Sequence, residues 1–245
     1  ARSFIAGLTM LAYLRKPRFT FSFAQVAAGA ANALTMTLFV LSTKLTTAAN
    51  AILLQYCAPI LVAILGWLIL KEKPRWEHWA GLVLIMAGIC IFFLDKVSGG
   101  NNMGNILALV SGFTFALYSI FLRKQKNGSP AESVILSHAL VSLAAVPFVF
   151  LFPPEVKASS LAAVFYLGIF QVGLASLLFT YGIKHIPALQ SMLIAGLEPI
   201  LNPLWVFFLI GEEPSANAIT GGLIIVVSVT LTSVISARRA ARTEA

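Results

Sequence analysis

Long apolar segments separated by short polar connections run through the whole of this 245-residue chain and set the limits on its fold. A helix needs about 20 apolar residues to cross the hydrocarbon core of a bilayer. We expect one partial and eight complete segments of this kind, at residues 3–14, 21–43, 47–70, 77–94, 104–122, 133–152, 160–183, 189–210 and 217–237. The sequence therefore predicts an all-α integral membrane protein.

The composition agrees with a lipid environment. Charged residues make up only 11% of the chain, whereas a soluble domain carries roughly 25%. We therefore expect the lipid bilayer to cover most of the outer surface. Cys57 and Cys90 both lie in apolar segments and have neither disulfide-framework nor metal-ligand spacing, so no metal site is predicted.

The net charge of +8 comes mostly from basic residues in alternate connections between the apolar segments. One side of the bilayer receives Arg15, Lys16, Arg18, Lys71, Lys73, Arg75, Arg123, Lys124, Lys126, Lys184, Arg238, Arg239 and Arg242. The other side receives Lys44, Lys96 and Lys157, with Arg2 near the same face. Positive residues favour the cytoplasmic side, so the C-terminus is predicted to be cytoplasmic. The short clusters form no continuous phosphate-binding surface, and no nucleic acid is expected as a partner.

The chain repeats itself at a fixed offset of 140 residues. When residues 38–95 are laid on 178–235 without a gap, twelve of the 58 positions are identical. The identities that do not come from shared hydrophobicity are Lys44 with Lys184, Pro59 with Pro199, Glu72 with Glu212, Pro74 with Pro214 and Gly81 with Gly221. The sequence therefore predicts two related halves, at residues 1–100 and 101–245.

The orientation of the halves follows from their helix number. The second copy starts near Met103, so the first copy is expected to lack its first helix and part of its second in this chain. A complete protein would have five plus five transmembrane helices, and an odd number per copy makes the repeat inverted. Inverted repeats are typical of secondary transporters, in which the two copies exchange conformations.

Two segments carry a resemblance to a known family. The first runs from Ala48 to Leu70 and is followed by Glu72-Lys73-Pro74. The second begins at Leu197-Glu198-Pro199-Ile200, reaches Ile210 and is followed by Glu212-Glu213-Pro214. On these residues the chain resembles, over its whole length, the ten-helix EamA-type branch of the drug/metabolite transporter superfamily. The resemblance implies an inverted bundle with a central cavity, a location in a bacterial-type inner (plasma) membrane, and movement of small organic solutes such as amino acids. We expect export as the direction of movement.

Glu198 is the most conspicuous candidate for a role in transport. It lies in an apolar segment, and its counterpart in the first copy is Ala58. Intramembrane carboxylates are costly and normally face the bundle interior or a wet path. Glu198 is a candidate to bind a substrate amine or to couple transport to protons; alternatively it hydrogen-bonds backbone freed by Pro199 and Pro203. Pro59 and Pro199 indicate paired bends, either as hinges or as kinks for packing.

Uncharged polar residues supply the remaining candidates for a solute-binding site. These are Gln25, Asn32, Gln55, Tyr56, Tyr118, Gln171 and Tyr181. Each is alternatively an interhelical hydrogen-bonding residue. His138 is interpreted either as a protonatable relay or as a hydrogen-bonded structural histidine. The pairs Gly81/Gly88 and Gly221/Ser228 place small residues on one helix face, which predicts close helix packing or a homodimer contact.

Other classes of protein fit less well. Asp95 is the only aspartate, and the chain has neither H-E-x-x-H nor G-x-S-x-G, so no enzyme is expected. It also has no glycine-rich phosphate loop, so no nucleotide or other cofactor is expected and coupling falls to a gradient, with protons a candidate ion. A scaffold, a receptor, an accessory subunit and a passive channel remain as alternatives to a transporter.

Overall fold

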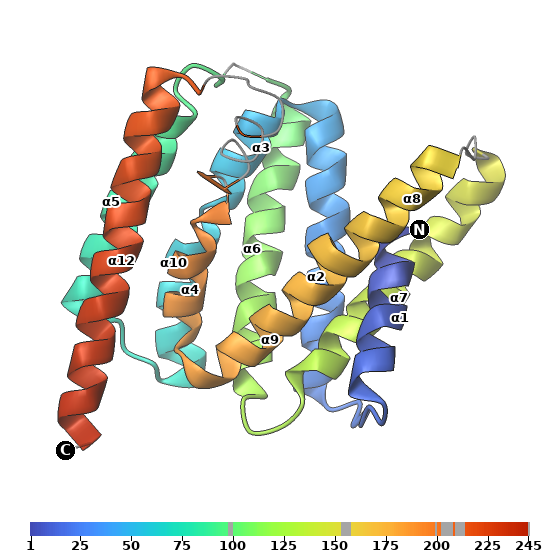
Figure 1. The fold of residues 1–245 in the computed structure, drawn as a ribbon, viewed down its shortest axis with the longest axis horizontal. Coiled ribbons are helices and arrows are strands. Elements are labelled where there is room, and N and C mark those ends of the chain that lie inside the picture. The colour runs from blue at the N-terminus through green and yellow to red at the C-terminus, as the bar shows by residue number, and fades with distance from the viewer. Residues whose placement is uncertain (98–99, 153–157, 199, 202–207, 209–213, 245) are drawn as a thin grey trace. The chain divides into compact units, whose positions relative to one another are not determined.

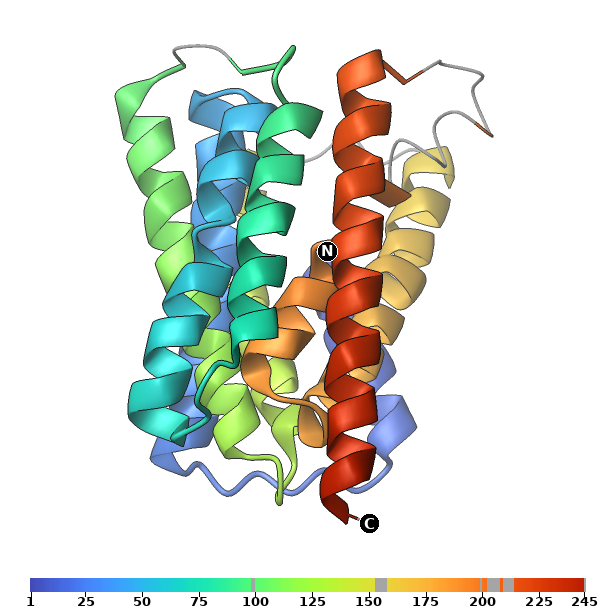
Figure 2. The ribbon, with the colours of Figure 1, turned by 90° about the vertical axis from the view of Figure 1, so that its left-hand side faces the viewer.

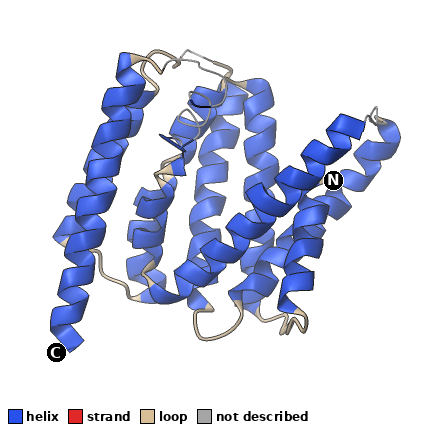
Figure 3. Cartoon of the chain, viewed as in Figure 1, coloured by secondary structure: helices blue, strands red, loops and turns tan. Residues whose placement is uncertain are grey.

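The computed structural model describes residues 1–97, 100–152, 158–198, 200–201, 208 and 214–244, and every regular element among them is helical (Figures 1 and 3). The first part of the chain forms α1 (Arg2–Leu14), α2 (Phe23–Leu45), α3 (Ala48–Gln55), α4 (Ala58–Leu65), the π-helix η1 (Gly66–Leu70) and α5 (Trp76–Phe92). The rest forms α6 (Asn102–Lys124), α7 (Pro130–Leu151), α8 (Ala158–Tyr166), the π-helix η2 (Leu167–Leu174), α9 (Ala175–His185), α10 (Ala188–Ala195) and α12 (Ala216–Glu244). The prediction of an all-α chain is confirmed.

Six helical stretches among the described residues are long and apolar enough to cross a bilayer. They are Phe23–Leu45, Ala48–Leu70, Asn102–Lys124, Pro130–Leu151, Ser159–His185 and Ala216–Arg239. The shorter helices α1 and α5 are also apolar. Each stretch corresponds to an apolar segment expected from the sequence, because a helix satisfies its backbone hydrogen bonds within itself in lipid. Of the segment expected at 189–210, α10 is described, and most of the remainder lies outside the described residues.

By its contacts the chain divides into two compact units, whose boundaries fall inside α2, inside α6 and directly before α10. Unit 1 comprises residues 1–38 and 114–187, and unit 2 comprises residues 39–113 and 188–245. Each unit therefore combines segments from both sequence halves. The division at residues 100 and 101 describes the repeat and stays a prediction.

In unit 1, α1 packs against η2 and α7, and α7 also contacts α9. Its core is apolar, with Met10, Ala28, Tyr118, Leu122, Val134 and Ile183 among the buried residues. Two polar contacts join helices here. The hydroxyls of Thr35 and Thr114 lie 2.8 Å apart, and the Asn32 amide nitrogen donates to the Ser137 hydroxyl over 2.7 Å.

In unit 2, α5 and α12 pack along their lengths and run in opposite directions (Figure 2). Near one end, the Arg239 guanidinium lies 3.4 Å from the Glu77 carboxylate. Near the other end, Asn217 donates to the Asp95 carboxylate over 2.6 Å. The two helices are thus joined by polar contacts at both ends of an apolar seam.

The glycines expected to allow close packing lie in this seam. A Cβ on Gly81 would meet Thr232, and one on Gly88 would meet Ile225 at 2.7 Å. The faces of α5 and α12 therefore cover each other within one chain. The close packing expected of Gly81/Gly88 and Gly221/Ser228 is thus found within one chain, and a homodimer through these faces stays a prediction.

The structure repeats at the offset found in the sequence. α3 covers residues 48–55 and α10 covers 188–195, while α5 begins at Trp76 and α12 at Ala216. The last helices of the two copies, α5 and α12, are antiparallel, as copies of opposite orientation require. The prediction of an inverted repeat is confirmed.

Candidate functional site

The candidate site in unit 2 is built on a helix break that occurs twice. After α3, the Tyr56 amide donates to the Ile52 carbonyl over 3.1 Å, and the Cys57 amide donates to Leu54 over 3.2 Å. The helix then resumes at Ala58. Pro59 lies in the first turn of α4, where the missing N–H of proline costs no hydrogen bond.

The same pattern follows α10, 140 residues later. The Gly196 amide donates to Met192 over 3.2 Å, and the Leu197 amide donates to Ile194 over 3.1 Å. Pro199, the counterpart of Pro59, lies outside the described residues. The helix is therefore interrupted at residues 56–57, just before Pro59, and the use of Pro59 and Pro199 as hinges stays a prediction.

Glu198 and Tyr56 come together at these breaks. α10 packs against α4, and the Tyr56 phenol and the Glu198 carboxylate interact electrostatically. Tyr56 is half-buried, whereas Glu198 is exposed at the surface of the described part of the chain. The structure thus brings two of the predicted site residues to one place.

Gln55 borders the same break but is held by a neighbouring helix. Its side-chain nitrogen donates to the Ser111 hydroxyl over 2.7 Å. Gly112 allows this approach, because a Cβ there would meet the Gln55 carbonyl oxygen at 2.9 Å. Gln55 therefore joins α3 to α6, and a solute would have to share or displace this hydrogen bond.

The other predicted polar residues belong to unit 1, and two of them, Gln25 and Asn32, make hydrogen bonds in its interior. Gln25 is 1% exposed, and its side-chain oxygen accepts from the amides of Thr20 and Phe21 at 3.0 and 2.8 Å. Asn32 bonds Ser137 on α7. Both residues thus make hydrogen bonds within the protein, as the alternative to solute binding expects. A role for either residue in solute binding stays a prediction.

Three aromatic and amide residues complete the predicted set. Tyr118 is buried in a ring stack with Phe115 and Phe179 at centroid distances of 6.1 and 6.0 Å. Gln171 is exposed and accepts a 3.4 Å hydrogen bond from Arg2. Tyr181 is also exposed, and its ring lies 4.6 Å from that of His185. The structure groups none of the three with Glu198 inside one unit.

Glu72 has a role that sequence reasoning missed. In the sequence Glu72 marks the repeat and the family resemblance. In the structure its carboxylate accepts a 3.0 Å hydrogen bond from the Ala188 amide, at the first residue of α10. A carboxylate is favoured at this place because helix N-termini carry unpaired N–H groups and a partial positive charge. The connection after η1 therefore fixes the start of the helix that ends beside Glu198.

No group of three or more His, Cys, Asp or Glu side chains among the described residues is arranged to hold a metal ion. The chemistry that the predicted site residues bring to the break is that of one carboxylate and one phenol.

Comparison with known proteins gives a family match and several similar transporters. The model of the EamA-like transporter family matches residues 1–94 and again residues 102–234. An uncharacterized transporter of Archaeoglobus fulgidus is 26% identical over 79% of this chain and 69% of its own length. The uncharacterized transporter YwfM of Bacillus subtilis is 27% identical over 67% of this chain and 57% of its own length, so the match spans less than two thirds of that relative.

A solved crystal structure has the same fold. It superposes with a TM-score of 0.79 at 20% sequence identity, covering 96% of this chain and 86% of its own. The family model matches twice, in two segments that together cover nearly the whole sequence. The apolar helices and these matches together make the chain a multi-pass membrane protein that belongs to the EamA-like transporter family.

Proposed function

We propose that this protein is a secondary transporter that exports a small polar metabolite, an amino acid or a related solute, across the inner membrane by alternating access. The observation that carries the proposal is the paired helix break with Glu198 and Tyr56 beside it. Interrupted helices at equivalent places in two repeats are typical of transporter binding sites, because their free backbone groups can bind a solute.

The charges near the break favour a zwitterionic solute. Glu198 offers a carboxylate to an ammonium group. The N-terminus of α4, which begins at Ala58, two residues after Tyr56, is expected to offer N–H groups and a partial positive charge to a carboxylate. A molecule carrying both groups a few bonds apart can use both partners, whereas a simple amine or a simple carboxylic acid uses one.

Alternating access is proposed from the inverted repeat. If the two copies exchange conformations, a site formed by both becomes open to one side and then to the other. The helix interruptions at residues 56–57 and 196–197 are the proposed hinges, with Pro59 and Pro199 following them in the sequence. Protons are the proposed coupling ion, because Glu198 is a carboxylate in an otherwise apolar segment that can lose a proton on one side and regain it on the other.

The test is counterflow in proteoliposomes with a panel of labelled amino acids, amines and carboxylic acids. We expect Glu198→Gln to lower transport of the zwitterions at least tenfold and to abolish its pH dependence, while Glu198→Asp keeps part of both. Asp95→Asn is the matched control, because it makes the same change at an exposed carboxylate bonded to Ser215 and Asn217. Unchanged transport by Glu198→Gln would assign Glu198 to helix support and contradict the proposal.

The same assay separates the remaining alternatives. A transporter that alternates accumulates label against unlabelled solute on the other side, whereas a passive channel equilibrates it. A scaffold, receptor or accessory subunit moves no solute on its own. Trans-stimulated accumulation by the wild-type protein therefore excludes the non-transporting alternatives and the channel together.

A further inference from the structure

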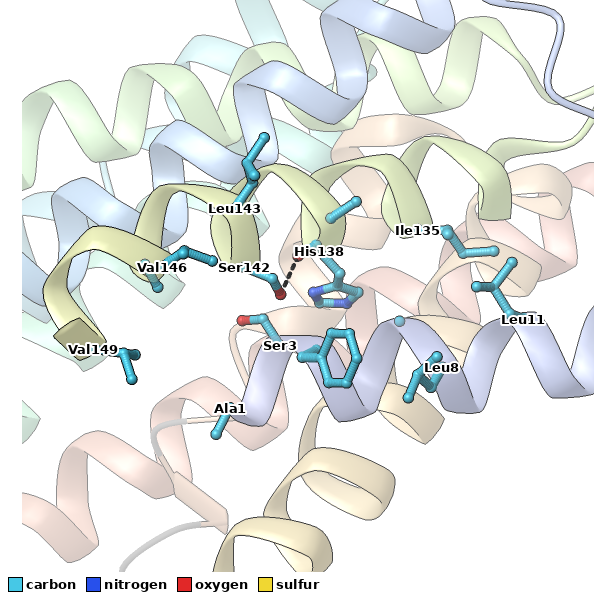
Figure 4. Close-up of a pocket in the computed structure, with 14 residues that line it drawn as sticks. Ala1, Ser3, Leu8, Leu11, Ile135, His138, Ser142, Leu143, Val146 and Val149 are labelled. Carbon is cyan, nitrogen blue, oxygen red and sulfur yellow. Dashed lines mark hydrogen bonds between the residues drawn. The ribbon is translucent and has the colours of Figure 1, made fainter. Parts of the chain in front are cut away.

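A groove in unit 1 lies between α1 and α7 and has a volume of about 550 Å³ (Figure 4). This volume is within the range of small-molecule sites in proteins. Most of its lining is hydrocarbon, and the polar side chains in it are those of Ser3, His138 and Ser142. No acidic side chain, lysine or arginine lines the groove.

His138 lies on the α7 side of this groove, facing α1 (Figure 4). Its side chain is only 1% exposed, and neither Nδ1 nor Nε2 has a hydrogen-bond partner among the described residues. The Ser142 hydroxyl does not serve as one, because it donates to the backbone carbonyl of His138 itself over 2.7 Å. The described residues therefore supply none of the side-chain hydrogen bonds that a structural role for His138 was expected to involve.

An imidazole in this position needs a partner. A neutral histidine has one N–H donor and one nitrogen acceptor, and burial of such groups without hydrogen bonds is unfavourable. The wall around His138 is apolar, with Phe4, Leu8 and Ile135 among its members. A complementary ligand has a hydrocarbon body and one group that can both donate and accept a hydrogen bond.

We propose that this groove binds an apolar molecule with a single hydroxyl or carboxylic acid group, which hydrogen-bonds to His138. The absence of charged side chains other than histidine disfavours a zwitterion or a polyvalent ion here. The site lies wholly within unit 1, whereas Glu198 and Tyr56 belong to unit 2. It is therefore a binding site in addition to the one proposed for the transported solute, and it can be tested independently of it.

The experiment is photolabelling of the purified, detergent-solubilised protein with a diazirine-bearing decanoic acid. A diazirine-bearing decane, which has the same body without the acid, is the control probe. Peptide mass spectrometry locates the label. We expect the acid to label α1 and α7 at least fivefold more in wild type than in His138→Leu, and His138→Gln to retain most of the labelling, while the decane labels all three proteins equally.

Two further variants keep the test informative if His138→Leu does not fold. Ala145→Phe places a large side chain in the groove and should reduce labelling by both probes. His185→Leu changes an exposed histidine at the end of α9 and should change neither. Size-exclusion profiles establish that each variant is folded.

Two outcomes overturn the proposal. The first is a loss of selectivity: the acid labels wild type and His138→Leu equally, or it labels all apolar helices evenly. The second is competition by phosphatidylcholine as strong as that by unlabelled decanoic acid, since this lipid has neither a hydroxyl nor a carboxylic acid group. Competition by decanoic acid alone supports a ligand with the proposed group, whether it arrives from the membrane or from water.

Discussion

Several buried polar side chains of this protein hydrogen-bond to backbone atoms, and Arg123 is the clearest example. Its side chain, 8% exposed, donates to the carbonyl oxygens of Ile183 and Lys184 at 2.8 and 2.7 Å. These carbonyls belong to the last turn of α9, where backbone acceptors have no partner within the helix. A cation is also favoured there by the helix dipole. Arg123 thus joins the end of α6 to the end of α9.

We expect Arg123→Ala to lower the free energy of unfolding by about 1.5–3 kcal/mol, because hydrogen bonds from a charged donor are lost and two carbonyls are left unpaired. Lys124→Ala is the matched control, since the neighbouring Lys124 is exposed. Thermal unfolding of the detergent-purified variants measures the difference. Equal melting temperatures for the two variants would show that water replaces the guanidinium at no cost.

At the residue scale, the sequence indicates which polar groups lie in the membrane but not what each one contacts. Gln25 and Glu198 both occur in apolar segments, yet Gln25 bonds the backbone of the connection before its own helix, and Glu198 interacts with Tyr56. Gln25 is bonded because the chain at residues 19–22 turns so that its amides reach the Gln25 side chain. No hydrophobic periodicity predicts that turn. Glu72 was missed for a similar reason, because its partner is a backbone amide 116 residues away.

At the element scale, helix positions were predictable and their internal irregularities were not. The expected segments at 47–70 and 160–183 contain a break and two π-helices. Pro59 marked the break, but η2 has no proline. Its glycines instead pack on α1, where a Cβ on Gly168 would meet Ile5 at 2.7 Å and one on Gly173 would meet Thr9 at 3.3 Å. Such irregularity depends on a tertiary neighbour, and local sequence carries little sign of it.

The seam between α5 and α12 makes a prediction about adjacent glycines. A Cβ on Gly221 would meet backbone atoms of Gly88 and Phe92, with the Phe92 Cα at 2.8 Å, whereas one on Gly222 would be an ordinary 3.4 Å from Ile200. Backbone atoms cannot rotate away, so Gly221→Ala should force the helices apart and cost about 1–3 kcal/mol.

The matched variant is Gly222→Ala, which should leave stability unchanged or raise it by up to about 1 kcal/mol through helix propensity. Thermal unfolding of both variants in the same detergent gives the comparison. A Gly221→Ala protein as stable as Gly222→Ala would mean that the two helices do not approach as closely as the structure shows.

At the scale of the whole molecule, the repeat was visible in the sequence and the packing was not. Identities at one offset revealed two copies, but the compact units each take helices from both. Contacts between copies are contacts between residues far apart in sequence, and a single sequence contains no direct record of them. The pairing of α5 with α12 is of this kind.

The distribution of basic residues makes a prediction about topology. Thirteen lysines and arginines fall in connections assigned to one side, against three or four on the other, so the C-terminus after α12 is expected in the cytoplasm. A fluorescent protein fused there should be bright in cells, and an alkaline phosphatase fused there should be inactive. An active phosphatase and a dark fluorescent protein would reverse the assignment.

The contact between α5 and α12 obeys a two-fold rule. Gly81 faces Thr232, and adding 140 to the first number and subtracting it from the second gives Gly221 and Phe92, which also face each other. In a dimer of two unfused copies such an interface would be isologous, so every substitution would be made twice, once on each side. When the two copies are joined in one chain, a substitution changes only one side of the interface. Gly81 and Gly221 have stayed the same, while Gly88 and Ser228 now differ, and each half can therefore change its share of the contact while the other half preserves the fit.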